Sequence, residues 1–140
     1  MDDTSDYRRG RSVVYALHVH LVFVTKYRRR VLDEAATATL RTIFARVCED
    51  FGAELRACDG EDDHVHLLVE YPPTVLLPTL VNSLKGVSSR RLKQEFPAIN
   101  AFWSVRKSRG VLWTPSYFAG SVGGAPLSVL KQYIKNQGLS

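Results

Sequence analysis

The sequence predicts one α+β domain in which two helices cover one face of a four-stranded antiparallel sheet. Apolar residues alternate with other residues in Val13–Thr25 and His64–Glu70, as they do in half-buried strands. Apolar residues at helical spacing follow each of these segments. The chain has 140 residues, enough for one core. We therefore expect a single domain over residues 13–140, preceded by a flexible arm over residues 1–12.

The first half of the domain predicts a strand, a helix and a second strand. In Val13–Thr25 one face is wholly apolar, and the histidines of His18-Val19-His20 fall on the other face. A helix is expected from about Asp33, with Gly52 as its C-cap. A short strand is expected from Glu54 to Ala57 or Cys58, followed by an acidic turn.

The next elements repeat this plan. The strand His64–Glu70 has the same parity as the first, so its two histidines face away from the core. A second helix is expected near Thr74, because Pro78 is tolerated in a first turn. The segment Pro97–Thr114 is irregular and is expected to be an extended hairpin or loop.

The chain ends with a predicted strand at Ser116–Val122 and a helix from Pro126 to Gly138. The resulting order of elements, β-α-β-β-α-β plus a helix, is that of the ferredoxin-like split β-α-β fold. In that fold the first and third strands are central neighbours. Their histidines would then lie on the face that the two covering helices leave bare, and the last helix of this chain or of a partner chain is the candidate to cover it.

Composition narrows the class of protein. Residues 72–140 hold nine basic side chains and one acidic one, whereas residues 1–71 hold ten basic and thirteen acidic ones. This uneven distribution of charge suggests a polyanionic partner, most simply nucleic acid. A solvated basic face is an equal alternative. Two cysteines and no secretion signal favour the cytoplasm over a disulfide scaffold. No apolar stretch is long enough to span a membrane.

The pair His64 and His66 is the strongest candidate for chemistry. Side chains at i and i+2 of a strand share a face, so both imidazoles could bind one metal ion. Asp62 and Asp63 are possible hydrogen-bond acceptors for these ligands. Gln137 offers an oxygen ligand, and such an open site suits a catalytic ion, Mg²⁺ or Mn²⁺, better than a structural zinc ion.

Other candidates carry weaker signals. Tyr133 stands four residues before Gln137 in the predicted last helix, so the two share a surface, but periodicity alone does not select this tyrosine among six. For His18 and His20 we expect packing or hydrogen bonding and not metal ligation.

These residues together resemble one known family, the single-tyrosine HUH transposases of small bacterial insertion sequences that move as single-stranded DNA with hairpins near their ends. The matching segments follow the family order and cover nearly all of the chain after the arm. They are His20–Arg28, Asp63–Leu68, Leu84–Gly86 with Ser88–Arg91, Leu112-Trp113 with Pro115–Tyr117, and Tyr133-Ile134 with Gln137. One departure is Asp62, where the family commonly has proline.

The resemblance implies an RRM-like or ferredoxin-like core and an obligate homodimer. It implies that His64, His66 and Gln137 hold a divalent ion, Mg²⁺ or Mn²⁺, and that Tyr133 is the nucleophile. The reaction would cleave and rejoin single-stranded DNA through a 5′-phosphotyrosine link. Basic residues would contact the DNA backbone, with Trp103 or Trp113 as stacking partners. The basic set is Lys85, Arg90, Arg91, Arg106, Lys107 and Arg109.

Two alternatives remain open from the sequence. A non-catalytic RRM-like nucleic-acid-binding protein would carry paired aromatic residues on its central strands, where this chain has histidines. Another HUH nuclease, of the replication-initiator or relaxase type, fits the short chain and its isolated terminal tyrosine less well.

Overall fold

The structure is a computed structural model that describes residues 8–9, 14–15, 17–99, 112–121 and 134–136. Its centre is a four-stranded antiparallel sheet in the order β4-β5-β3-β6. The strands are β3 (Leu17–Val24), β4 (Glu54–Glu61), β5 (His64–Tyr71) and β6 (Phe118–Ser121).

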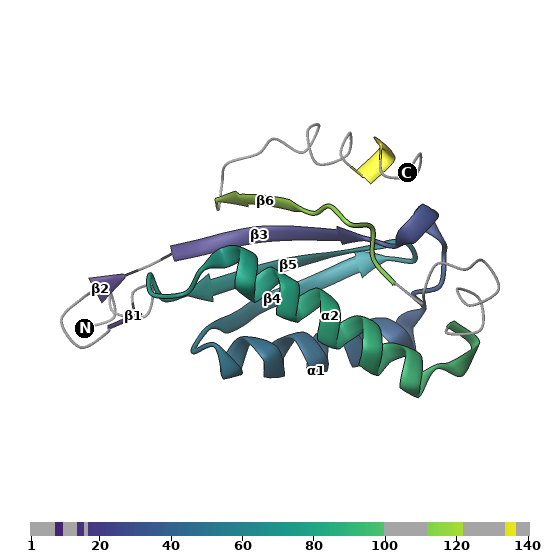
Figure 1. Cartoon of the computed structure of the whole chain (residues 1–140), viewed down its shortest axis with the longest axis horizontal. Helices are drawn as coiled ribbons and strands as arrows, with labels where there is room; N and C mark the ends of the chain where they lie inside the picture. Colours follow the sequence, from purple (N-terminus) through teal and green to yellow (C-terminus); the bar gives the residue numbers. More distant parts are fainter. Residues whose placement is uncertain (1–7, 10–13, 16, 100–111, 122–133, 137–140) are drawn as a thin grey trace.

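Two helices, α1 (Glu34–Asp50) and α2 (Leu77–Glu95), lie together on one side of this sheet (Figure 1). The structure therefore confirms the predicted α+β fold, including the central position of the first and third predicted strands, which are β3 and β5. None of the helices in the described ranges combines the length and the apolar character needed to cross a bilayer.

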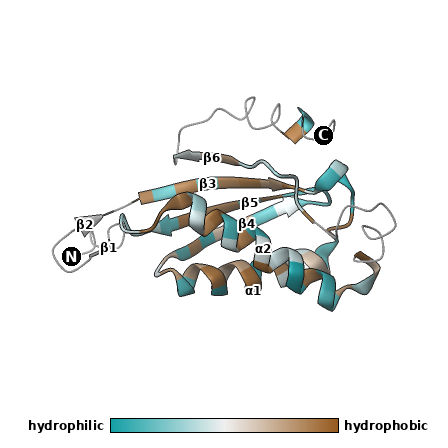
Figure 2. Ribbon diagram, in the orientation of Figure 1, coloured by the Kyte–Doolittle hydropathy of each residue, from teal (hydrophilic) through white to brown (hydrophobic). Residues whose placement is uncertain are grey.

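The register of β3 against β5 sorts the side chains of the sheet between its two faces. The strands pair along their whole length, with Leu17 opposite Tyr71 and Val24 opposite His64. Every second residue is buried against α1 and α2, and Figure 2 shows how hydrophobic β3 and β5 are. The strand residues of this core are Val19, Leu21, Phe23, Val65, Leu67 and Val69.

Helix α1 begins and ends as its sequence predicts. The Asp33 side chain accepts a hydrogen bond of 2.8 Å from the backbone N–H of Ala36, which satisfies one of the free donors of the first turn. Gly52 follows the helix with φ of +72°, a conformation that glycine adopts without strain.

Several element boundaries differ from the sequence prediction. The first predicted strand is divided into β2 (Val14–Tyr15) and β3, and β2 pairs with β1 (Arg8–Arg9), within the segment expected to be a loose arm. Strand β4 continues to Glu61, because backbone pairing with β5 does not depend on the polarity of the side chains. Helix α2 begins at Leu77, after a turn closed by the hydrogen bond from Val75 N to Pro72 O.

The face of the sheet away from α1 and α2 has a small apolar cluster of its own. Val22 and Val24 of β3 are fully buried there, in contact with Phe118 and Ile134. Ile134 belongs to the described helical residues 134–136, which lie on this side of the sheet (Figure 1). The expectation that the last helix covers the second face is therefore met at Ile134, while the rest of that predicted helix lies outside the described residues.

Both cysteines are free and buried. Burial raises the pKa of the Cys48 thiol to about 12 and that of Cys58 to about 11. The two side chains are therefore neutral, unreactive members of the core, as expected for a chain without disulfides.

We predict opposite effects of alanine at two glycines. At Gly60 a Cβ atom would lie 2.3 Å from the carbonyl oxygen of His64 and 2.8 Å from the Cα atom of Val65, so Gly60→Ala should lower the free energy of unfolding by about 2 kcal/mol or more. At Gly86, inside α2, nothing lies within 4 Å, so Gly86→Ala should raise it by about 0.5–1 kcal/mol. Urea unfolding followed by circular dichroism measures both, and equal effects would contradict the packing of the β4–β5 turn.

Candidate functional site

Three histidines from the two central strands meet on the face of the sheet opposite α1 and α2. The ring centroids of His64 and His66, both in β5, are 5.0 Å apart, and those of His20 and His66 are 5.2 Å apart. His64 is only 7% exposed and His66 is half-buried. The sequence predicts that His18 or His20 lies near His64 and His66 on this face; the structure confirms this for His20, which contacts His66.

In both β5 histidines the Nδ1 atom is engaged by a neighbouring side chain. His64 Nδ1 lies 2.8 Å from Asp63 Oδ1, and His66 Nδ1 lies 3.1 Å from His20 Nε2. Within the described part of the chain no partner is seen for either Nε2 atom. The geometry therefore leaves one ring nitrogen of each histidine available to a ligand.

Asp63 is fixed from two sides, because Arg28 Nε donates to its second oxygen, Oδ2, at 2.9 Å. Burial alone would raise the pKa of this carboxyl, but the hydrogen bonds from His64 and Arg28 outweigh it and hold the pKa below its usual value. Asp63 is thus an ionised acceptor that orients the His64 ring, the role expected for one of the two aspartates. The side chain of Asp62 is exposed.

The chain reverses sharply after β3 to bring Arg28 to this carboxylate. Tyr27 and Arg28 in the short 3-10 turn Lys26–Arg28 have φ of 61° and 52°, a left-handed conformation that is costly for residues other than glycine. Thr25 secures the same turn, because its N–H donates to the carbonyl oxygen of Asp63 at 2.9 Å and its hydroxyl donates to the carbonyl oxygen of Arg29 at 2.7 Å. The strained turn is therefore stabilised by its contacts with the residue that precedes the histidine pair.

Two of the histidines are held in the neutral state. Burial lowers the pKa of His66 to about 4, with further lowering from the nearby His64 and His20, and burial also lowers the pKa of His20. A neutral imidazole with a free lone pair is the form that binds a metal ion. At neutral pH the site therefore favours ligation by His66 over a positive charge on its ring.

His64 and His66 fit a metal ion that would also need ligands from outside the described residues. Ligand nitrogens lie about 2 Å from an ion, so two rings whose centroids are 5.0 Å apart can share one. Among the described residues no group of three or more His, Cys, Asp and Glu side chains could hold a metal. The pair therefore needs additional donors, as an open catalytic site does.

Tyr133 and Gln137, the predicted nucleophile and third ligand, lie outside the described residues. Between them in the sequence, Ile134 contacts the cluster of Val22 and Val24. Val24 is paired with His64 and Val22 with His66 across the β3–β5 ladder. The residue next to Tyr133 in the sequence therefore packs on the face of the sheet that carries the histidine pair.

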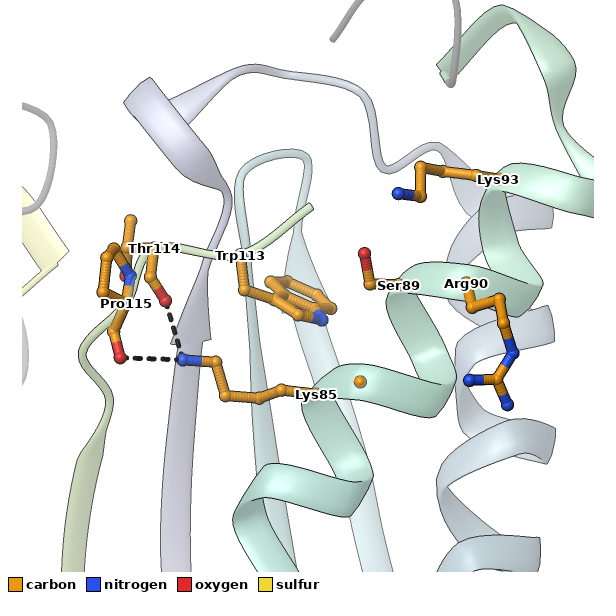
Figure 3. A pocket seen from close by; sticks show the side chains of 8 residues that line it. Lys85, Ser89, Arg90, Lys93, Trp113, Thr114 and Pro115 are labelled. Atoms are coloured by element: carbon orange, nitrogen blue, oxygen red, sulfur yellow. Dashed lines mark hydrogen bonds between the residues drawn. The ribbon is translucent and has the colours of Figure 1, made fainter. Parts of the chain in front are cut away.

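The predicted DNA-contacting residues of α2 lie on the other side of the sheet, where Lys85 and Arg90 line a cavity. This cavity has a volume of about 380 Å³, and Lys85, Arg90 and Lys93 are among its lining residues (Figure 3). Arg90 and Arg91 are exposed and can reach an anionic partner. Arg106, Lys107 and Arg109 lie outside the described residues.

Lys85 is tied to the segment that leads into β6. Its ammonium group donates to the carbonyl oxygens of Thr114, Pro115 and Ser116 at 2.7, 3.1 and 3.3 Å, and Figure 3 shows the first two bonds. Burial lowers the pKa of Lys85 to about 8. All three N–H donors thus have acceptors within the protein, so the structure assigns Lys85 a role in joining α2 to β6.

The expectation that Trp113 stacks on bases is wrong. Its side chain is 1% exposed, its indole N–H donates to Ser88 Oγ at 2.9 Å, and its ring contacts Phe23 and Phe44 in the core. A ring without accessible surface cannot stack on a base. Trp103, the other candidate, lies outside the described residues.

The sequence alone did not indicate the contact between His20 and His66 or the role of Arg28. The partners of His20 and Arg28 lie 46 and 35 residues away, so no local spacing could identify these contacts. The only available signal was the repetition of the His-Val-His tripeptide in two strands that the fold places side by side. His18, in contrast, lies 3.3 Å from the buried carboxylate of Glu70, which agrees with the expected structural role.

The chain belongs to the IS200-like transposase family, whose model matches residues 13–137. This places it among the single-tyrosine HUH transposases, as its motifs had indicated, and implies an enzyme of DNA transposition that cleaves and transfers DNA strands. The central strands also argue against a non-catalytic RRM-like binding protein. The β3 and β5 residues on the histidine face include no aromatic pair of the kind that an RRM uses.

Named relatives support this assignment. The chain is 33% identical over 131 residues to the ISDra2 transposase TnpA of Deinococcus radiodurans, covering 93% of this chain and 90% of the relative. It is 28% identical over 118 residues to the transposase for insertion sequence element IS200 of Salmonella typhimurium, covering 84% of this chain and 74% of the relative.

Solved structures share the fold. A Deinococcus radiodurans protein crystallised as a candidate transposase superimposes with a TM-score of 0.80 at 35% identity, over 93% of this chain and 97% of the other. A REP-associated tyrosine transposase bound to a REP hairpin superimposes with a TM-score of 0.55 at 12% identity, over 91% and 67% of the two chains, a likeness of fold.

We predict that Lys85→Met lowers the free energy of unfolding by about 1–3 kcal/mol, because three carbonyl oxygens lose a charged donor. Arg91→Met, at an exposed position of the same helix, is the matched control and should change it by less than about 0.5 kcal/mol. Thermal or urea unfolding measures both variants. Equal stability of the two would show that the Lys85 contacts contribute nothing to the fold.

Proposed function

We propose that this transposase cleaves and rejoins single-stranded DNA at the ends of its insertion sequence through a 5′-phosphotyrosine link on Tyr133. The observation that carries the proposal is the histidine pair: His64 and His66 each have Nδ1 held by the protein, with Nε2 left for an ion. The position of Ile134 over Val22 and Val24 supports placing Tyr133 on the same face of the sheet.

A divalent ion, Mg²⁺ or Mn²⁺, would be held by His64, His66 and Gln137. When bound it supplies positive charge that polarises the scissile phosphate and stabilises charge on the leaving oxygen. This assistance is needed because a tyrosine with an ordinary pKa near 10 is a poor nucleophile at neutral pH.

The chain itself would carry out the covalent step. The Tyr133 oxygen forms a bond to phosphorus, the bond from phosphorus to the 3′ oxygen breaks, and the phenolic proton is lost while the 3′ oxygen gains one. The products are a 5′-phosphotyrosine and a free 3′-hydroxyl, so the phosphodiester energy is conserved. Attack by a 3′-hydroxyl of another strand reverses the step and completes strand transfer without ATP.

DNA binding would use the basic residues of the second half of the chain. Arg90 and Arg91 are exposed on α2, and Arg106, Lys107 and Arg109 follow in the sequence. Lys85 remains a predicted contact, although a phosphate would have to compete with its three carbonyl partners. We propose a DNA hairpin as the recognised form, because the hairpin-bound REP-associated transposase has a similar fold.

A homodimer is part of the proposal. Strand β6 is an edge of the sheet and is paired only with β3 among the described strands, so its other side offers backbone donors and acceptors to a second copy. A dimer would also allow the last helix of one subunit to complete the site of the other. Light scattering coupled to gel filtration tests the stoichiometry.

We predict that Tyr133→Phe abolishes the covalent adduct with DNA, because the variant lacks the phenolic oxygen. The assay incubates protein, Mn²⁺ and single-stranded oligonucleotides that tile the DNA flanking the chain's own coding sequence, and it detects the adduct by denaturing electrophoresis. Tyr27→Phe, which changes an exposed tyrosine, is the control and should keep the adduct. An adduct formed by Tyr133→Phe would overturn the assignment of the nucleophile.

We further predict that replacing His64 and His66 together by alanine lowers cleavage at least 100-fold while hairpin affinity changes less than about threefold. The reason is that the histidine pair and the basic α2 surface lie on opposite sides of the sheet. Cleavage by gel assay and affinity by fluorescence anisotropy measure the two activities. Lost hairpin binding with intact cleavage would contradict this division of roles.

A further inference from the structure

We propose that His20 is a positioning residue for the metal site: its Nε2 accepts a hydrogen bond from Nδ1–H of His66 and thereby directs the lone pair of His66 to Nε2. The inference deepens the proposed function, on which its role in metal binding rests. For His20 the sequence indicated only packing or hydrogen bonding.

The contact is built into the central strand pair. His20 Nε2 and His66 Nδ1 are 3.1 Å apart, and the rings are tilted by 36°. His66 is paired with Val22 in the ladder, so His20 is its diagonal neighbour on the same face, a position from which ring side chains make contact. Because β3 is buried and paired on both sides, the His20 ring is mounted on a rigid element.

The direction of this hydrogen bond decides whether His66 can bind an ion. A neutral imidazole has one N–H and one lone pair. If His66 donates from Nδ1, its lone pair is on Nε2; if His20 donates, the proton of His66 is on Nε2 and that nitrogen cannot be a ligand. His64 has the equivalent arrangement with Asp63, whose ionised carboxylate can only accept. His20 would thus do for His66 what Asp63 does for His64.

The chain provides a matched control in the same tripeptide. His18 lies two residues before His20, on the same strand and face, but its Nε2 is 3.3 Å from Glu70 Oε1. Substitutions at the two positions therefore change the same residue type in the same strand. Only the one at position 20 removes a partner of His66.

The first experiment observes the tautomer directly in the metal-free protein, without DNA. Long-range ¹H–¹⁵N spectra of the imidazoles should show His66 with its proton on Nδ1 in the wild type and in His18→Phe. In His20→Phe, which keeps an aromatic ring but has no acceptor, a substantial Nε2–H fraction should appear. An Nε2–H form of His66 in the wild type, or an unchanged spectrum in His20→Phe, would overturn the inference.

The second experiment measures the affinity for Mn²⁺ from the electron paramagnetic resonance signal of the free ion. We expect His20→Phe to weaken binding about 10- to 100-fold, the usual effect of losing a group that orients a ligand. His18→Phe should stay within about threefold of the wild type. His20→Gln, whose amide oxygen can accept, should recover part of the loss, which a merely structural role for the ring would not explain.

These readouts separate the inference from the proposed function. A wild-type protein that binds no Mn²⁺ would defeat the metal site, while the tautomer spectra would still decide whether His20 orients His66. Equal Mn²⁺ affinities of His20→Phe and wild type would defeat the positioning role, even if the DNA adduct on Tyr133 were observed. Amide spectra of each variant verify the fold, and His20→Leu, which also has no acceptor, replaces His20→Phe if the latter is unfolded.

Discussion

The antiparallel register between β3 and β5 is the constraint on which the site depends. A shift of one residue would turn Val19, Leu21 and Phe23 out of the core, so burial of these side chains fixes the alignment. The same alignment brings His20 to His66 and places His64 opposite Val24. The hydrophobic core on one face of the sheet thus sets the geometry of the polar chemistry on the other.

Additional contacts stabilise the end of this strand pair. Asp63 receives hydrogen bonds from Arg28 and His64 through its side chain and from Thr25 through its backbone carbonyl. The left-handed turn at Tyr27 and Arg28 has a cost of roughly 1–3 kcal/mol per residue, which these bonds and the turn's attachment to Leu112 help to offset. Strain of this kind often accompanies functional sites, and here it lies immediately beside the histidine pair.

The two faces of the sheet carry different groups of side chains. The covered face carries α2 and its basic residues, and Lys85 joins that helix to the segment before β6. The opposite face carries the histidines and, at Ile134, the chain that follows β6. Strand β6 therefore connects the two faces. The segment that leads into it is bonded to Lys85 of α2, and its Phe118 packs on Val22 and Val24, as Ile134 does. Under the proposed function, one face would bind the nucleic acid and the other would act on the scissile bond.

The sequence by itself determined the fold class, the order of elements, the two faces of the central strands and the histidine pair, because alternation and helical spacing are local consequences of which side chains are buried. It also supplied the family motifs. Only the tertiary structure decided that His20 contacts His66, that Arg28 fixes Asp63, that Lys85 is tied to carbonyl groups and that Trp113 is in the core. The first two contacts join residues 46 and 35 positions apart, and Lys85 reaches backbone groups 29 to 31 positions away. Their geometry depends on how strands and helices pack, which no local pattern records.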